Sequence, residues 1–248
     1  DLFEQFGTPR ENEKYKQYFA RLFNDATIGF DEPESGPARY VHTDEIVAWC
    51  RTHRITMKGC FESRCNRGAL FVTTPGQRDS VRKQIAEVMA RYKGAIDHWE
   101  VVSEPTHFLN QVALNPDEIR VERVKQCYQW ARHVHPEARL ILTRRDVMDS
   151  EGTFAPFLSE IQGGDPADKA LGDGTLIDII GIQIHEPLGT RPAPAKVLRT
   201  LDRYAAWGLP IHITQLALPS DGRPIRNSWK QGTWTEREQA DYAVALYT

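Results

Sequence analysis

The stretch "GLPIHITQLALPSDG", residues 208–222, has the pattern of a buried strand that runs out into a loop. Apolar and β-branched residues lead up to Thr214 and Gln215, and Pro219 and Gly222 then turn the chain. A polar side chain at the carboxyl end of a strand is typical of an active site in a β/α barrel, because such sites are assembled at that end of the barrel. The sequence therefore makes Gln215 a candidate site residue, although an acid would be the more usual choice there.

Five further runs share this strand pattern, and segments of helical periodicity lie between them. The predicted strands cover residues 25–30, 55–61, 96–103, 139–143, 176–185 and 209–216, and the predicted helices cover residues 11–23, 43–53, 77–93, 116–134, 153–162, 194–207 and 235–247. Helix start signals support two of these helices: Asn115 before Pro116, and a capping box from Thr235 to Glu238. This alternation favours a parallel sheet with right-handed crossovers.

Polar residues at the ends of the predicted strands favour a closed barrel over an open sheet. The chain contains neither the GxGxxG nor the GxxxxGK[ST] motif that an open nucleotide-binding sheet would carry. The fold class expected is therefore α/β, a (β/α)8 TIM barrel, as one domain over residues 1–248. No eighth strand is found and the first is doubtful, so the predicted barrel is incomplete at one or both chain ends. The strand-end polar residues are Glu62, Ser103, Glu104, Arg144, Arg145, Gln183, His185 and Gln215.

Composition excludes several classes of function. The chain has 248 residues and a net charge of −3, which does not suit a nucleic-acid binder. No apolar run approaches the length of a membrane span. The four cysteines lack CxxC spacing, so neither a metal site nor a cofactor is expected. Cys60 and Cys65 are close enough in sequence to form a disulfide, but free thiols fit equally well.

The motif "WEVVSEP", residues 99–105, has the strongest chemical meaning. An aromatic and β-branched strand ends in Ser-Glu-Pro, and Pro105 favours an extended Glu104 at the strand end. Glycosidic cleavage commonly uses two carboxyl groups on opposite sides of the bond, one of them a general acid. Glu104 is a candidate for that acid, and the alternative is a solvated loop glutamate.

At several motifs the chain resembles glycoside hydrolase family 10, the endo-β-1,4-xylanases. "YFARLFNDAT" (18–27), "EPESG" (32–36) and "DEIVAWCRTHRITMKG" (44–59) are similar to family segments. "WEVVSEP" is similar to Trp-Asp-Val-Val-Asn-Glu, which implies an acid/base role for Glu104. "IDIIGIQIH" (177–185) resembles the strand that implies contacts to substrate and nucleophile from Gln183 and His185. "LPIHITQL" resembles Leu-Pro-Ile-x-Ile-Thr-Glu-Leu, so Gln215 stands at the nucleophile position.

The chain also departs from the family pattern around the expected site. Ser103 replaces the asparagine before the acid/base, Cys60 stands where a histidine is expected, and "TRRD" (143–146) replaces an Asn-Asp-Tyr run. The family's Asn-Glu-Met-Lys-Trp segment is missing between Thr27 and "EPESG". Even so, Glu104 and Gln215 are separated by about three β/α units, which would place them across the barrel mouth from one another.

Three explanations account for Gln215. A glutamate-to-glutamine change is nearly isosteric, so it could be an engineered substitution that silences the nucleophile. A second explanation is a natural loss in a divergent branch. A third possibility is a relocated nucleophile at Glu62 or Glu186, for which a rim salt bridge and a solvated loop acid are the respective structural alternatives.

Other candidate substrate-binding residues have structural alternatives too. His185 could be a hydrogen-bonded core histidine. Arg144 and Arg145 could contact an acidic sugar branch or pair with carboxylates of the barrel. Trp229 and Trp234, in the loop after the strand of residues 209–216, could stack on sugar rings. His107 lies just beyond "SEP" and could face the substrate.

The resemblance implies retaining hydrolysis of internal β-1,4-xylosidic bonds in xylan, inactivated here by Gln215. The alternatives are an inactive barrel that binds plant polysaccharide and a barrel glycosidase of altered specificity. The expected partner is xylan or a xylo-oligosaccharide, without nucleic acid or membrane, and with further domains outside this segment. The resemblance implies a secreted or periplasmic protein. The chain itself shows no signal peptide, so this expectation rests on the resemblance alone.

Overall fold

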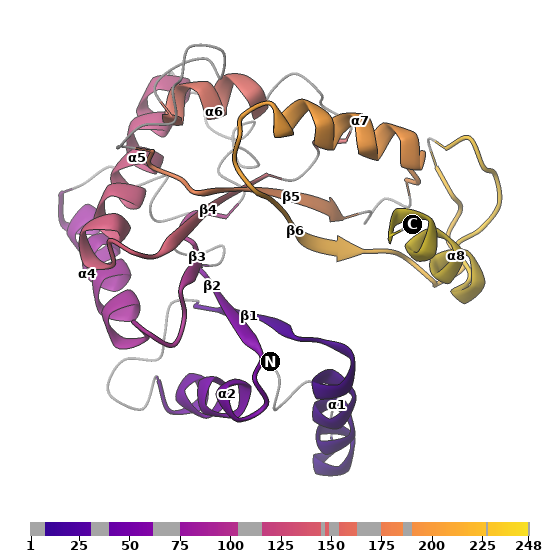
Figure 1. The fold of residues 1–248 in the computed structure, drawn as a ribbon, viewed down its shortest axis with the longest axis horizontal. Coiled ribbons are helices and arrows are strands. Elements are labelled where there is room, and N and C mark those ends of the chain that lie inside the picture. Colours follow the sequence, from indigo (N-terminus) through magenta and orange to yellow (C-terminus); the bar gives the residue numbers. More distant parts are fainter. Residues whose placement is uncertain are drawn as a thin grey trace. The chain divides into compact units, whose positions relative to one another are not determined.

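The computed structural model describes residues 8–30, 40–61, 75–103, 116–144, 147–148, 154–162, 175–185, 190–226 and 228–247. Helices and strands alternate along this part of the chain (Figure 1). The helices are α1 (Pro9–Leu22), α2 (Val41–Thr52), α4 (Pro75–Arg91), α5 (Pro116–Val134), α6 (Phe154–Gln162), α7 (Pro194–Ala205) and α8 (Glu236–Tyr247). The strands are β1 (Asp25–Gly29), β2 (Thr56–Cys60), β3 (His98–Glu100), β4 (Arg139–Arg144), β5 (Ile179–His185) and β6 (Ile211–Ala217).

The chain packs as two compact units. Unit 1 comprises Asp1–Ser103 and Gln126–Leu140, and unit 2 comprises Glu104–Lys125 and Ile141–Thr248. Within unit 1, β2 pairs in parallel with both β1 and β3. Within unit 2, β5 pairs in parallel with both β4 and β6. The predicted parallel α/β architecture is therefore confirmed in each unit, and the strands follow the order of the chain.

The first residue of β4 is fixed within unit 1. The backbone N–H of Arg139 donates to the carbonyl of Asp97, just before β3, over 2.7 Å. The strand then continues into unit 2, where Ile141 pairs with Ile179. β4 thus contributes residues to both units.

Trp99 of β3 is the centre of the unit 1 core. Its side chain is fully buried, and its ring centroid lies 5.4 Å from that of Phe30 and 5.6 Å from that of Phe61. The indole covers Gly59 of β2 so closely that a Cβ atom there would meet it at 2.3 Å. Gly59 is required because any side chain would displace the largest ring of the core.

A buried ion pair lies beside this aromatic core. Lys58 of β2 and Glu100 of β3 approach to 3.0 Å, with 9% and 2% of their side chains exposed. The second carboxylate oxygen of Glu100 has no hydrogen-bond partner among the described residues. Burial raises the pKa of the nearby Tyr128 hydroxyl, and the charge of Glu100 raises it further. A charged pair in this position makes the interior of unit 1 sensitive to loss of either partner.

In unit 2, β5 is a buried apolar strand. Ile179, Ile180 and Ile182 are buried, as expected for a strand with both faces covered. A Cβ on Gly181 would lie 2.2 Å from the hydroxyl oxygen of Thr143, so β4 and β5 meet closely there. Helix α7 contacts β6 (Figure 1), and its Val197 and Tyr204 side chains are buried.

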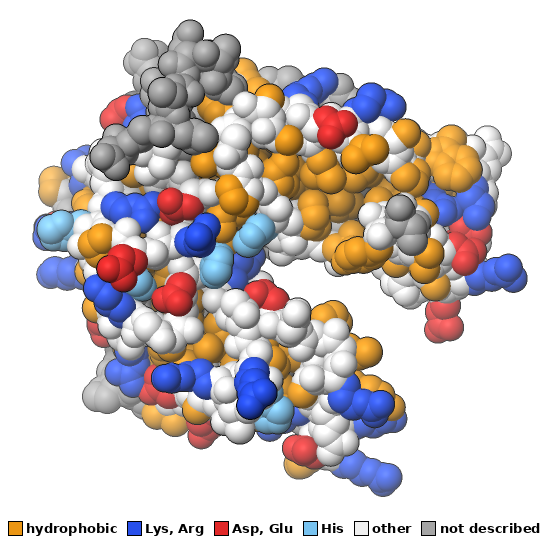
Figure 2. Space-filling model, in the orientation of Figure 1, with side chains coloured by type: hydrophobic (Ala, Val, Ile, Leu, Met, Phe, Trp, Pro, Cys, Tyr) orange, Lys and Arg blue, Asp and Glu red, His pale blue; other side chains and the backbone are white. Residues whose placement is uncertain are grey.

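β6 is more exposed than β5. Among the described residues it pairs only with β5, and Ile213 is 42% exposed. Figure 2 shows hydrophobic side chains gathered over β6 and α7 in unit 2. The exposed apolar side chains of these two elements include Ile213 and Leu198.

The helix start signals are confirmed in part. Thr235 accepts a hydrogen bond from the N–H of Glu238 over 3.2 Å, which caps α8. The carboxylate of Glu238 instead pairs with Arg191 and Lys230. In a capping box it would accept a hydrogen bond from the backbone N–H of Thr235. α5 begins at Pro116 as predicted, whereas Asn115 lies outside the described residues.

Asp44 ties α2 to the end of α4 in unit 1. Its carboxylate accepts a hydrogen bond of 3.1 Å from Arg91 Nε and another of 3.0 Å from the Tyr92 hydroxyl. The hydrogen bond from Arg91, and a smaller effect of that from Tyr92, lower the pKa of Asp44 despite partial burial. The carboxylate therefore adds stability above its unfolded pKa of about 3.9, and this is lost as pH falls through the lower folded pKa.

We expect Asp44→Asn to lower the free energy of unfolding at pH 7 by roughly 0.5–1 kcal/mol, the range of exposed ion pairs. The difference from the unmodified chain should shrink at an acid pH below the lowered folded pKa of Asp44, where its side chain is as neutral as that of asparagine. Urea unfolding at the two pH values measures this. A difference that stays the same at both pH values would show that the charge of Asp44 contributes nothing.

Candidate active site

Two glutamines lie side by side at the carboxyl ends of β5 and β6. Ile182 pairs with Ile213, but the next pair is Gln183 with Gln215, so Thr214 is an extra residue on β6. This is a β-bulge, and the Thr214 hydroxyl donates to the carbonyl of Ile182 over 3.4 Å. The bulge aligns Gln215 with Gln183, which the sequence analysis did not anticipate.

Gln183 offers a hydrogen-bond donor at this position. Its side chain is buried, and its Nε2 atom has no hydrogen-bond partner among the described residues. A buried amide without a partner costs about 1–3 kcal/mol, so the site is suited to an acceptor that this part of the chain lacks. Gln215 on the next strand is exposed. A ligand oxygen or a carboxylate at position 215 would supply such an acceptor.

Arg144 ends β4 in the same unit. Its Cα pairs with that of Ile182, one residue before Gln183, and its side chain is partly buried. The guanidinium carbon lies 6.0 Å from the ring centroid of Phe154. Arg144 is thus in register with Ile182 and lies beside Phe154 of α6, and its two predicted roles stay predictions. Arg145 lies outside the described residues.

Several predicted site residues lie outside the described part of the chain. Glu104, Glu62, His107 and Glu186 belong to this group. The predicted approach of Glu104 and Gln215 therefore stays a prediction. Ser103, just before Glu104, is buried, and β3 ends three residues earlier than expected, at Glu100. His185 closes β5 with its Cα paired to that of Ala217, and its side chain is not described.

The two tryptophans of the loop after β6 differ in their surroundings. Trp234 is fully buried, with its ring centroid 5.8 Å from that of Tyr242 in α8, so its role in this structure is packing. Trp229 is 65% exposed. Of the two rings predicted to stack on sugars, only that of Trp229 is accessible, because the base of the loop folds Trp234 into the core.

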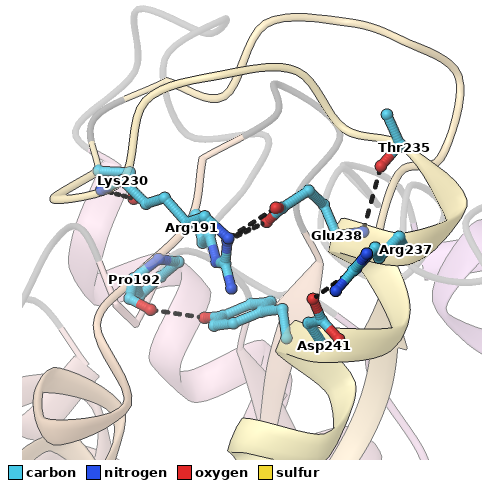
Figure 3. Close-up of polar contacts among 9 residues, drawn as sticks. Arg191, Pro192, Lys230, Thr235, Arg237, Glu238 and Asp241 are labelled. Atoms are coloured by element: carbon cyan, nitrogen blue, oxygen red, sulfur yellow. Dashed lines mark hydrogen bonds and ion pairs between the residues drawn. The ribbon is translucent and has the colours of Figure 1, made fainter.

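The residues that surround Trp229 are not evident as a site from the sequence alone. Arg191, before α7, pairs with Glu238 over 2.6 Å while being almost fully buried, and Lys230 meets the same carboxylate over 2.6 Å (Figure 3). The hydrogen bond from Lys230, followed by that from Arg191, lowers the pKa of Glu238. Among these residues, only Glu238 stands out in the sequence, as part of a predicted capping box.

Cysteines and acidic residues do not form a metal site in the part of the chain that the structure describes, where no group of three or more potential ligands comes together. Burial raises the pKa of the Cys50 thiol to about 11, and the nearby Asp25 adds to this effect. That thiol is therefore protonated and unreactive at neutral pH. Cys60 is buried at the end of β2, whereas Cys65 lies outside the described residues. None of the described helices is long and apolar enough to span a membrane.

Comparison with known proteins identifies relatives over most of the chain. Endo-1,4-beta-xylanase 2 of Arabidopsis thaliana is 25% identical over 230 residues, covering 87% of this chain and 20% of the relative. Beta-1,4-xylanase of Dictyoglomus thermophilum is 27% identical over 192 residues, covering 72% of this chain and 52% of the relative. The chain thus spans between a fifth and about half of these two proteins.

Several solved structures share the fold of this chain. Xylanase 10B from Thermotoga petrophila RKU-1, solved in complex with xylobiose, matches 99% of this chain and 74% of its own with a TM-score of 0.69 and 19% identity. A GH10 xylanase of Thermobacillus composti matches 96% of this chain and 74% of its own with a TM-score of 0.67 and 18% identity. These likenesses confirm the predicted fold class as part of a TIM barrel.

The family assignment rests on a match over nearly the whole chain. The model of glycosyl hydrolase family 10 matches residues 7–246, including both glutamines and the motif at residues 99–105. The strand order in each unit agrees with such a barrel. This chain belongs to glycosyl hydrolase family 10.

Proposed function

We propose that the chain is a xylan-directed domain with the site of a retaining endo-β-1,4-xylanase, in which Gln215 stands in place of the nucleophile. The observation that carries this proposal is the pairing of Gln215 with Gln183 at the carboxyl ends of β5 and β6 in a family 10 chain. Chemistry in TIM barrels takes place at these strand ends. The described relatives are named as xylanases, which supports xylan as the substrate.

In this proposal Glu104 acts as the general acid. It donates a proton to the glycosidic oxygen while a carboxylate about 5–5.5 Å away attacks the anomeric carbon, and the bond to the leaving sugar breaks. Water then hydrolyses the glycosyl ester, with Glu104 accepting the proton of that water. The stereochemistry at the anomeric carbon is retained after these two inversions.

Gln215 interrupts this sequence at its first step. Its amide carries no negative charge to stabilise the oxocarbenium-like transition state, and it does not form the ester that water would later open. The amide nevertheless keeps the size and shape of a glutamate side chain. The proposed consequence is a domain that holds a xylan chain in its site and does not cleave it.

A second candidate function is a non-catalytic domain that binds plant polysaccharide. Gln215 itself favours this candidate, because a lost nucleophile leaves the sugar-binding surface of a glycosidase in place. The two candidates predict the same behaviour for the chain as it stands. They differ in whether restoring a carboxylate at position 215 restores turnover.

We expect the chain to release no reducing ends from xylan above the rate in buffer, while its migration in a native gel is slowed when soluble xylan is cast into the gel. The same chain in a polysaccharide-free gel, and a non-binding reference protein in both gels, are the controls. Xylan hydrolysis at the rate of an active xylanase would show that another carboxylate serves as nucleophile, with Glu62 and Glu186 the first to replace. Unchanged migration in xylan and in other β-1,4-linked polysaccharides would contradict both candidates.

A further inference from the structure

The loop between β6 and α8 is folded as a hairpin with Trp229 in its tip. Backbone hydrogen bonds of 2.7–2.9 Å join Gly222 to Trp234, Trp234 to Arg223, and Ile225 to Gly232. Pro224 and Thr233 form an antiparallel bridge between these bonds. These contacts join residues 222–225 to residues 232–234 and so fix the two ends of the tip.

A second backbone contact anchors one side of this hairpin. Arg226, at the start of the tip, forms a parallel bridge with Thr190, which lies between β5 and α7. Thr190 is buried and directly precedes Arg191. The segment that positions Trp229 is therefore joined to the segment that supplies the buried arginine.

Arg191 supports the indole of Trp229 from within the protein. Its guanidinium carbon lies 5.5 Å from the ring centroid of Trp229, 5.7 Å from that of Trp234 and 4.8 Å from that of Tyr242. The Arg191 side chain is only 4% exposed. A cation in this position is desolvated, which strengthens its attraction to the aromatic faces.

The position of Arg191 is fixed in turn by α8. Glu238 binds Arg191 Nη1 over 2.6 Å, and both of its oxygens lie 2.6 Å from Lys230 Nζ (Figure 3). The Tyr242 hydroxyl donates to the carbonyl of Pro192 over 2.7 Å, so the segment next to Arg191 is held as well. Lys230 directly follows Trp229 in the chain, so its ion pair with Glu238 also fixes the backbone next to the indole.

An exposed tryptophan with this support differs from the scattered apolar side chains of ordinary surfaces. Its ring is held before a ligand arrives, so little conformational entropy remains to be lost on binding. With Arg191 on the inner side, the solvent side presents a flat apolar ring. The C–H face of a pyranose is a flat apolar partner of similar size, whereas its hydroxyl groups remain in water.

We propose that Trp229 is a stacking platform for one pyranose unit of a β-1,4-linked polysaccharide, and that Arg191 is a positioning residue that holds the ring in place. The identity of the polysaccharide as xylan rests on the proposed function. The stacking itself rests only on the exposed ring and the buried network behind it. The platform binds sugar and takes no part in bond cleavage.

The first test compares two exposed aromatic residues by titration calorimetry with xylohexaose. Trp229→Ala should lower the affinity roughly tenfold, as removal of a central aromatic contact does. Tyr18→Ala is the matched control, because Tyr18 is 50% exposed and has Lys14 5.7 Å from its ring centroid, but lies on the open surface of α1. That variant should bind like the unmodified chain.

The second test asks whether Arg191 acts through Trp229. Arg191→Met removes the charge and keeps the length, and should weaken binding several-fold, whereas Arg191→Lys should weaken it less. In a Trp229→Ala background, Arg191→Met should cause no additional loss, because the ring that it positions is gone. An additive loss in the double variant would overturn the positioning role, and circular dichroism checks that each variant is folded.

The outcomes separate this inference from the proposed function. If the unmodified chain binds xylohexaose and Trp229→Ala binds it equally well, the platform is overturned while the proposed function stands. If the chain instead prefers cellohexaose or mannohexaose and Trp229→Ala weakens that binding, the platform stands and the assignment to xylan falls. If the unmodified chain binds none of the three oligosaccharides, both are overturned.

Discussion

Gln215→Glu is expected to raise the rate of xylan hydrolysis on the order of 10⁴-fold or more above that of the unmodified chain. Loss of the nucleophile in a serine protease costs more than this, on the order of 10⁶-fold in kcat. The substitution exchanges one amide nitrogen for oxygen, so the strand and its bulge keep their geometry. Gln183 Nε2, which is buried and has no hydrogen-bond partner among the described residues, would lie on the strand next to the new carboxylate.

Release of reducing ends from xylan and xylo-oligosaccharides measures this effect. Gln215→Ala is the matched control, because it alters the same position without supplying a carboxylate. Glu104→Ala in the Gln215→Glu background should remove most of the gained activity, since the leaving sugar then lacks its proton donor. Retention of the anomeric configuration in the first product should accompany the gain.

Failure of this substitution would be equally informative. A folded Gln215→Glu protein that binds xylan but hydrolyses none of these substrates would favour the non-catalytic binding function. The departures around Ser103 and Cys60 would then extend the loss beyond one residue. A gain that survives Glu104→Ala would instead reject Glu104 as the acid.

Lys58→Met is expected to lower the free energy of unfolding by about 3–5 kcal/mol. The substitution leaves the Glu100 carboxylate buried without its counter-charge, and breaking one side of a buried pair has this cost. In a chain of this length the loss corresponds to a fall in melting temperature of roughly 6–20 °C. Thermal unfolding followed by circular dichroism at pH 7 measures it.

The paired variant Lys58→Met with Glu100→Leu distinguishes lost charge from lost packing. Removing both charges also removes their desolvation cost, so the double variant should recover most of the stability. A double variant as unstable as Lys58→Met alone would show that the side-chain volumes, and not the ion pair, determine the effect.

The regular elements could be predicted because each has a local cause in the sequence. The apolar β-branched run of β5 and the Thr235 cap of α8 require no information beyond neighbouring residues. β3 was predicted too long because Val101 and Val102 are buried like strand residues but lie beyond the end of the strand. A sequence pattern reports burial and extended preference, and it does not report which backbone groups meet a partner strand.

The arrangement of the candidate site depends on contacts between distant parts of the chain. The bulge at Thr214 depends on how β6 pairs with β5, and no residue of "LPIHITQL" predicts it. Trp229 and Trp234 have similar sequence contexts, yet the hairpin base buries one and exposes the other. Arg191 and Glu238 meet across 47 positions of sequence, so their ion pair has no local signature.

The hairpin of residues 222–234 also bears on how such a protein can change over evolutionary time. Its base is closed by backbone hydrogen bonds, which any sequence of suitable conformation can form. Gly222 and Gly232, with φ angles of 80° and 134°, meet the conformational demands of the turns. Residues between the closing bonds can therefore be exchanged without disturbing the barrel strands. Substitutions within this hairpin could therefore change which sugars the protein binds while the barrel strands stay the same.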